Sequence, residues 1–194
     1  MTVDPKNPAR FETLIDRFSS LLDSSVDEAR IIEGGGRLLR ELVAHDDWLP
    51  ALYAVPGSDR YQQYLLHRDQ YDRFSVVSFV WNPGQSTPIH DHRVWGLVGV
   101  LRGAERVVTY SRDQAGNLFP DSEVRILSAG DVEAISPKIG DIHSVSNARE
   151  GDVSVSIHIY GGDIGRIERA TYDASGRPKP FVSGYADAPT LSRH

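Results

Sequence analysis

The sequence predicts a mainly β protein in which a helical N-terminal segment leads into a barrel or sandwich of two sheets. Short β-branched and aromatic runs after about residue 70, turn residues between them and helical periodicity before about residue 60 support this prediction. A chain of 194 residues suits one domain. We therefore expect helices over about 1–60, a β-barrel over about 70–172 and an irregular tail over 173–194.

Apolar residues spaced three and four apart predict the helical segment. Asn7 and Pro8 are typical of a helix start. The apolar stripe that follows consists of Phe11, Leu14, Ile15, Phe18, Leu21 and Leu22. The triple glycine at 34–36 is expected to break the chain before a second helix over 36–44, and a third short helix is expected over 47–55.

Seven further segments are rich in β-branched or aromatic residues and predict strands. They cover 74–81, 94–101, 105–111, 123–127, 132–135, 142–146 and 153–160. Turn residues separate them. The prolines at 178, 180 and 189 favour an irregular tail that lies over the barrel surface.

Composition and charge exclude several classes of function. The net charge of -6 argues against a nucleic-acid partner, because phosphate neutralisation needs a basic face. Disulfides, thiolate metal sites and cysteine nucleophiles are excluded because the chain has no cysteine. No apolar run approaches the roughly 20 residues that span a bilayer, and the first residues have no signal-peptide core. We expect a cytoplasmic protein without a membrane partner, and the sequence does not predict its oligomeric state.

Three histidines have the spacing of metal ligands. His90 and His92 are two residues apart, so on a strand they would point to one face. His143 follows some fifty residues later, three positions after Gly140 and four before Asn147. With Gly84 and Gly103 flanking the first pair, this pattern resembles the two motifs of the cupin superfamily, Gly-x5-His-x-His-x3-Glu-x6-Gly and Pro-x-Gly-x2-His-x3-Asn. The resemblance implies a jelly-roll barrel and a divalent metal such as Fe(II), Ni(II) or Zn(II).

The cupin glutamate is missing, because its position is Gly96. A site of three neutral histidines keeps the full +2 charge of the metal and favours an anionic substrate, such as a thiolate, as a direct ligand. Asp91 and Glu105 are the nearest carboxylates in the sequence. Asp91 is expected to point to the face opposite His90 and His92, and Glu105 lies beyond the turn at Gly103.

Ser156, His158 and Tyr160 alternate along one predicted strand, so their side chains share one face. Beside three histidines, this triad resembles the thiol dioxygenase family of cupins, to which cysteine dioxygenase belongs. The resemblance implies Fe(II) on His90, His92 and His143, with Ser156, His158 and Tyr160 beside it. Members with a cysteine cross-linked to the tyrosine carry it where this chain has Gly96, so that cross-link cannot form here.

One difference between this sequence and the cysteine-specific branch of the family predicts the substrate. The cysteine-specific branch binds the substrate carboxylate with an arginine that corresponds here to Gln63. A glutamine at this position resembles the bacterial 3-mercaptopropionate dioxygenase branch, in which an arginine beyond the tyrosine binds the carboxylate. We predict Arg169 for this role, with Arg166 as the second candidate.

The predicted reaction is the addition of both atoms of O2 to the sulfur of a small thiol carboxylate, most simply 3-mercaptopropionate to 3-sulfinopropionate. L-Cysteine is the rival substrate. A cupin of another class, either a metal-dependent isomerase or a sensor that binds a small acid, is the alternative function, and metal content with a thiol screen would separate them.

Overall fold

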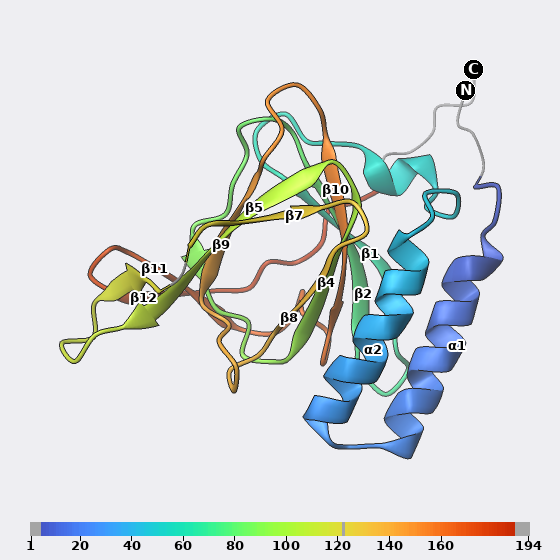
Figure 1. Ribbon diagram of the computed structural model, residues 1–194, viewed down its shortest axis with the longest axis horizontal. Helices are drawn as coiled ribbons and strands as arrows, with labels where there is room; N and C mark the ends of the chain where they lie inside the picture. Colours follow the sequence, from blue (N-terminus) through green and yellow to red (C-terminus); the bar gives the residue numbers. More distant parts are fainter. Residues whose placement is uncertain (1–4, 122, 189–194) are drawn as a thin grey trace.

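The structure, a computed structural model, describes residues 5–121 and 123–188. Two helices, α1 (Ala9–Ser24) and α2 (Glu28–Val43), lie side by side against one face of a β-barrel (Figure 1). A single 3₁₀ turn, η1 (Ala51–Ala54), leads from them into the strands. None of the helices in the described part of the chain is long and apolar enough to cross a membrane.

Two antiparallel sheets form the barrel. The first has the order β1-β2-β10-β4-β8 and consists of β1 (Gln62–Arg68), β2 (Ser75–Trp81), β10 (Ser154–Tyr160), β4 (Gly96–Arg102) and β8 (Val132–Ile135). The second has the order β12-β11-β3-β9-β5-β6, with β7 also paired to β5. Its strands are β12 (Pro178–Phe181), β11 (Arg169–Tyr172), β3 (Ile89–His90), β9 (His143–Asn147), β5 (Ala104–Arg112), β6 (Leu118–Pro120) and β7 (Arg125–Ser128).

The helices follow the predicted apolar stripe, but the break at the triple glycine is wrong. Helix α2 begins after Asp27, whose side chain accepts a hydrogen bond from the Ala29 N–H at 3.1 Å, and it runs through Gly34, Gly35 and Gly36 without interruption. At Gly35 a Cβ atom would come within 2.6 Å of the Phe18 ring on α1. The glycine therefore allows close packing between the helices and does not end one.

The third helix predicted over 47–55 is also wrong, apart from η1. Pro50 disfavours helical backbone at the residue before it and has no N–H to continue a helix. Helical geometry therefore begins only at Ala51.

The tail predicted to be irregular contains a strand. Pro178–Phe181 forms β12, which pairs with β11 at the edge of the second sheet. An edge strand tolerates Pro178 and Pro180 because its outer side needs no N–H donors. Residues 1–4 and 189–194 of the predicted terminal segments lie outside the described residues.

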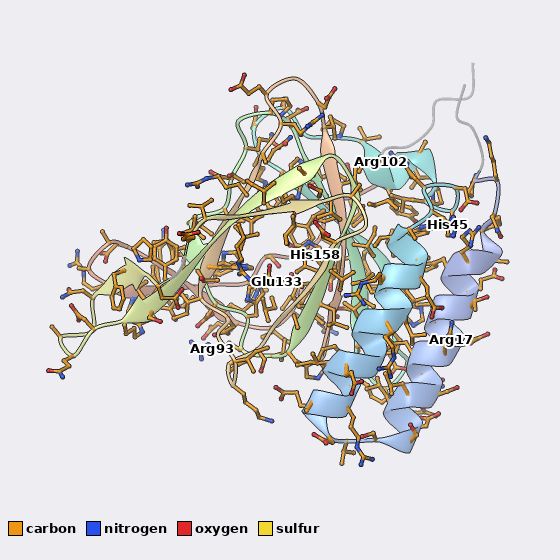
Figure 2. The ribbon with its side chains drawn as sticks, in the orientation of Figure 1. Arg17, His45, Arg93, Arg102, Glu133 and His158 are labelled. Carbon is orange, nitrogen blue, oxygen red and sulfur yellow. The ribbon has the colours of Figure 1, made fainter. Side chains whose placement is uncertain are left out.

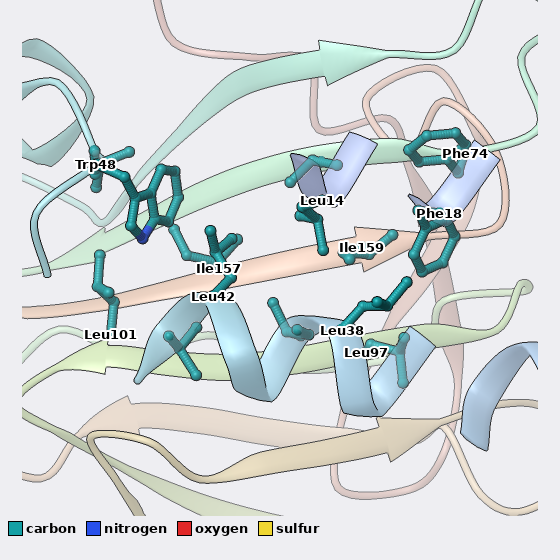
Figure 3. Close-up of a cluster of buried hydrophobic side chains, with 14 of the residues drawn as sticks. Leu14, Phe18, Leu38, Leu42, Trp48, Phe74, Leu97, Leu101, Ile157 and Ile159 are labelled. Carbon is teal, nitrogen blue, oxygen red and sulfur yellow. The ribbon is translucent and has the colours of Figure 1, made fainter. Parts of the chain in front are cut away.

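The described residues form two apolar clusters, one on each side of the first sheet. The larger fills the space between the helices and the sheet and includes Phe18, Ile157 and Ile159, all 0% exposed (Figure 3). The smaller lies between the two sheets. Because successive side chains of a strand point to opposite faces, β10 presents its isoleucines to the helices and its polar residues to the barrel interior.

Candidate metal centre

Three histidines meet inside the barrel, at the side of the second sheet. His90 ends β3 and is paired directly with His143, the first residue of β9. His92 lies beyond the end of β3, so the predicted strand does not extend to it. One ring nitrogen of each histidine lies within 4.8 Å of the others, and all three residues are buried.

Backbone carbonyls orient two of the imidazoles. His90 Nδ1 donates to the Pro88 carbonyl at 3.0 Å, and His92 Nδ1 donates to the Asp141 carbonyl at 3.1 Å. A proton on Nδ1 leaves the Nε2 lone pair free to bind a metal. His143 Nδ1 is buried and, among the residues described, has no hydrogen-bond partner.

Burial keeps these imidazoles neutral. It lowers the pKa of His90 to about 4, and it lowers the pKa values of His92 and His143 well below their usual range, with mutual repulsion adding to the effect. Neutral imidazoles are the form that binds divalent first-row metals. The three histidines therefore fit a divalent metal ion by both their spacing and their protonation.

No carboxylate joins this group among the described residues. Asp91 is directed away, as expected, and accepts hydrogen bonds from the Ala170 N–H at 2.8 Å and the Tyr172 hydroxyl at 2.6 Å. At Gly96 a Cβ atom would lie 2.9 Å from the Tyr160 ring, so the absence of a side chain there makes room for the tyrosine.

The predicted triad forms a continuous hydrogen-bonded chain on β10. Ser156 Oγ lies 2.8 Å from His158 Nε2, and His158 Nδ1 lies 2.8 Å from the Tyr160 hydroxyl. Figure 2 shows His158 inside the barrel, where its ring stacks on Phe79 at 4.2 Å between centroids. The Tyr160 ring stacks on the His92 ring at 5.6 Å between centroids, which places the tyrosine beside the three histidines.

The histidine and the tyrosine of the triad are neutral as well. Burial lowers the pKa of His158 to about 3 and raises the pKa of Tyr160 above its usual range. A neutral imidazole has one N–H donor and one acceptor nitrogen, so His158 can donate a hydrogen bond to one neighbour and accept one from the other.

A cavity of about 270 Å³ is lined by the three histidines, by His158 and Tyr160 of the triad, and by the predicted arginine. Arg169, at the start of β11, is 4% exposed, and its guanidinium lies 4.7 Å from the centre of the Phe181 ring. Its Nη2 donates to Ser183 Oγ at 2.8 Å, whereas its buried Nε has no partner in the described part of the chain. Arg166, the second candidate, is exposed and does not line the cavity.

Gln63 lies on β1 and also lines the cavity. Its Nε2 donates to Ser183 Oγ at 3.0 Å and to the Gly184 carbonyl at 2.8 Å. Ser183 therefore contacts both predicted substrate residues.

Sequence reasoning did not assign several residues of the cavity wall, among them Tyr61, Lys179 and Phe181. Tyr61 stacks on Trp81 at 4.5 Å, and Lys179 and Phe181 come from β12. Tyr61 is only two positions from Gln63, so their alternation on one face would have indicated it. The β12 residues lay in a segment predicted to be irregular.

The two facing antiparallel sheets and the N-terminal helices confirm the fold class predicted from the sequence, a mainly β, double-sheet barrel with an N-terminal helical segment. No protein-family model matches the chain. An uncharacterized conserved protein with a double-stranded β-helix domain from Klebsiella pneumoniae is 18% identical, with 57% of this chain and 84% of that chain covered at a TM-score of 0.45.

Two other similar structures are a cupin 2 domain-containing protein and a polyketide cyclase. The first, from Halorhodospira halophila, is 19% identical, with 70% of this chain and 78% of that chain covered at a TM-score of 0.45. The second, RemF from Streptomyces resistomycificus, is 23% identical, with 54% and 67% covered at a TM-score of 0.41.

Proposed function

We propose that this protein is an Fe(II)-dependent thiol dioxygenase that acts on a small thiol carboxylate. The observation that carries the proposal is the meeting, in one cavity, of three neutral histidines, a tyrosine held by a hydrogen-bonded chain and a buried arginine. Thiol and O2 would combine as R–SH + O2 → R–SO2H, so both oxygen atoms end on sulfur. Fe(II) held by His90, His92 and His143 would supply the activation of O2 and sulfur.

Arg169 is the group that would bind the substrate carboxylate. Its guanidinium is buried, and its Nε has no hydrogen-bond partner among the described residues. A buried positive charge in this state favours an anion beside it. Burial lowers the pKa of Arg169, with opposing effects from nearby tyrosines and Asp91. A carboxylate that accepts from Nε and a terminal nitrogen would be held in a fixed orientation, with its thiol directed to the histidines.

Tyr160 would orient the reacting group from the opposite wall of the cavity. Its hydroxyl is held by His158, which Ser156 holds in turn, so the position of the hydroxyl is fixed before a ligand binds.

The cavity favours 3-mercaptopropionate over L-cysteine. Among the described residues that line it, Arg169 and Lys179 carry positive charge and none is a carboxylate. The ammonium group of cysteine would therefore be buried without a counterion, which is costly. The resemblance to the two branches predicts that Gln63→Arg shifts the ratio of kcat/KM towards L-cysteine, because an arginine at this position binds the substrate carboxylate in the cysteine-specific branch. An unchanged ratio would reject the role assigned to Gln63.

Oxygen uptake by the iron-loaded protein tests the proposal. We expect uptake with 3-mercaptopropionate and formation of the sulfinate in equal amount, with weaker activity on L-cysteine. Arg169→Met should raise KM about tenfold to a hundredfold, the loss of a charged hydrogen bond of about 1.5–3 kcal/mol, whereas the matched exposed variant Arg166→Met should not.

No uptake with any small thiol would refute the proposal. Zinc, or no metal, in protein purified without added metal would then favour an isomerase or a sensor of small acids. The cytoplasmic location stays a prediction from the sequence.

A further inference from the structure

The residue between His90 and His92 binds the strand that carries Arg169. This residue, Asp91, is 7% exposed, and both its backbone and its carboxylate contact β11. Its N–H donates to the Ala170 carbonyl at 3.0 Å, and its Oδ1 accepts from the Ala170 N–H at 2.8 Å. Its Oδ2 accepts from the Tyr172 hydroxyl at 2.6 Å. The proposed chemistry gives this buried carboxylate no role.

The side chain of Asp91 makes a bond that the backbone makes in a regular sheet. The pairing of β3 with β11 ends where His90 faces Thr171. In a regular antiparallel pair, Asp91 and Ala170 would then exchange two backbone hydrogen bonds. Asp91 donates the first of them, but the Ala170 N–H donates to the carboxylate instead of the Asp91 carbonyl. The main chain can therefore leave the sheet after Asp91 while β11 stays attached.

The main chain does turn away directly after Asp91. Arg93 has φ +64°, in the left-handed region that side chains other than glycine seldom adopt. The Asp141 carboxylate holds this turn, because its Oδ2 accepts from the N–H groups of His92 and Arg93 at 3.0 and 3.2 Å. Asp141 lies two residues before His143, so it connects the second histidine to the third.

Two carboxylates thus connect the same turn to different parts of the site. Asp141 connects His92 to the segment of His143, whereas Asp91 connects the turn to the peptide group that follows Arg169. We propose that Asp91 is a positioning residue that sets the distance between the candidate metal centre and Arg169. The identity of the anion that Arg169 binds, a thiol carboxylate, rests on the proposed function.

This distance matters because a thiol carboxylate has to reach both groups at once. Its carboxylate would lie at Arg169 while its sulfur lies at the metal that the three histidines would hold. A displacement of about 1 Å between two such groups can cost about a hundredfold in rate. The contacts of Arg169 with Ser183 and Phe181 fix its guanidinium against β12 and the tail. They do not fix β11 against the histidines, which the Asp91 bonds do.

Two affinities measured on the full-length protein separate the two kinds of positioning. Zn(II) titration of the metal-free protein reports on the histidines, and calorimetry of 3-mercaptopropionate binding to the Zn(II)-loaded protein reports on the distance to Arg169. Asp91→Ala should raise the Kd for the thiol about tenfold and leave the Kd for Zn(II) nearly unchanged. Asp141→Ala is the matched control and should do the reverse, raising the Kd for Zn(II) about tenfold to a hundredfold.

Two further variants separate positioning from charge and from a general loosening of the fold. Asp91→Asn keeps an acceptor for the Ala170 N–H and places an amide donor against the Tyr172 hydroxyl, so it should restore the affinity for the thiol. The ion pair that it loses is with Arg93, which is 58% exposed, and such pairs contribute little. Tyr172→Phe removes one bond from the β11 side and should raise the thiol Kd about threefold, but should add nothing to Asp91→Ala.

Equal losses of Zn(II) and thiol affinity in Asp91→Ala, or a full additional loss from Tyr172→Phe in that background, would overturn the proposal. If Asp91→Ala does not fold, an unchanged thiol Kd in Tyr172→Phe, or a tenfold loss in Asp91→Asn, would overturn it as well. Absence of thiol binding to the unmodified Zn(II) form would also refute it. Failure of the proposed function is distinguishable, because absence of O2 uptake by the iron-loaded protein would leave these binding measurements, which need no turnover, in place.

Discussion

Replacing Gly35 by alanine tests the packing of the helix layer. The side chain would be added inside α2, at a position with helical neighbours on both sides. Its Cβ atom would lie 2.6 Å from Phe18 Cε2 and 2.8 Å from Leu97 Cδ1. Phe18 and Leu97 are 0% and 1% exposed, so neither ring nor methyl group has free space into which it can move.

Two opposing effects decide the magnitude. Alanine gains about 0.8–1 kcal/mol over glycine in a helix interior. Overpacking a filled core costs about 1–3 kcal/mol. The repulsion should exceed the gain here, because two contacts are far inside van der Waals distance. We expect a net loss of about 1 kcal/mol, or a Tm lower by about 2–4 °C for a chain of this size.

The neighbouring glycine gives a matched control. At Gly36 the nearest atom to an added Cβ is Leu97 Cδ2 at 3.9 Å, an ordinary contact. Gly36→Ala should therefore gain the helix propensity and raise Tm by about 2–3 °C. Urea unfolding of both variants beside the parent chain measures the difference. Equal stabilisation by the two alanines would refute the reasoning.

Three further predictions concern ionisation, metal binding and the cavity. Hydrogen bonds from Arg73 lower the pKa of the buried Asp69 to about 2. The carboxylate therefore contributes about 2 kcal/mol to the free energy of unfolding above pH 3.8, and this contribution is lost as pH falls through about 2. The free energy of unfolding of Asp69→Asn should lack this pH dependence, and a profile identical to that of the parent protein would contradict the prediction. Divalent metal at about 100 times its Kd should add about 2.7 kcal/mol to the free energy of unfolding, an effect that thermal scans should show removed in His92→Ala and kept in the exposed control His45→Ala. Ser183→Ala removes an acceptor from Arg169 and should raise KM for the thiol about fivefold, with kcat nearly unchanged; a fall in kcat alone would show that the hydroxyl does not position the substrate.

Local patterns predicted most of the barrel because they depend on neighbouring residues. The alternation and β-branching of 74–81 and 153–160 correspond to β2 and β10 within one residue. The errors arose where distant contacts decide. A glycine is needed at position 35 inside the helix because Phe18 and Leu97 occupy the space that a side chain would fill. Strand β12 forms because β11 provides a hydrogen-bonding partner.

The candidate site likewise combines residues that the sequence predicted with a residue whose position only the fold determines. The spacing of His90, His92 and His143 predicted a group that the structure brings together, because the sheet pairing places β3 beside β9. Glu105 looked from the sequence like a distant carboxylate near a turn. Its contact with Ser154 of β10 results from the two sheets facing each other, which no local pattern contains.

The contact of Ser183 with both Gln63 and Arg169 has a consequence for biosynthesis. Ribosomes release the chain from its N-terminus, so the histidines and the triad emerge before residue 183. The Ala186 N–H then closes the wall by donating to the Gln63 carbonyl at 2.8 Å. The wall that orients Arg169 is thus completed by residues near the end of the described chain, after the three histidines and the Ser156–His158–Tyr160 triad have been translated.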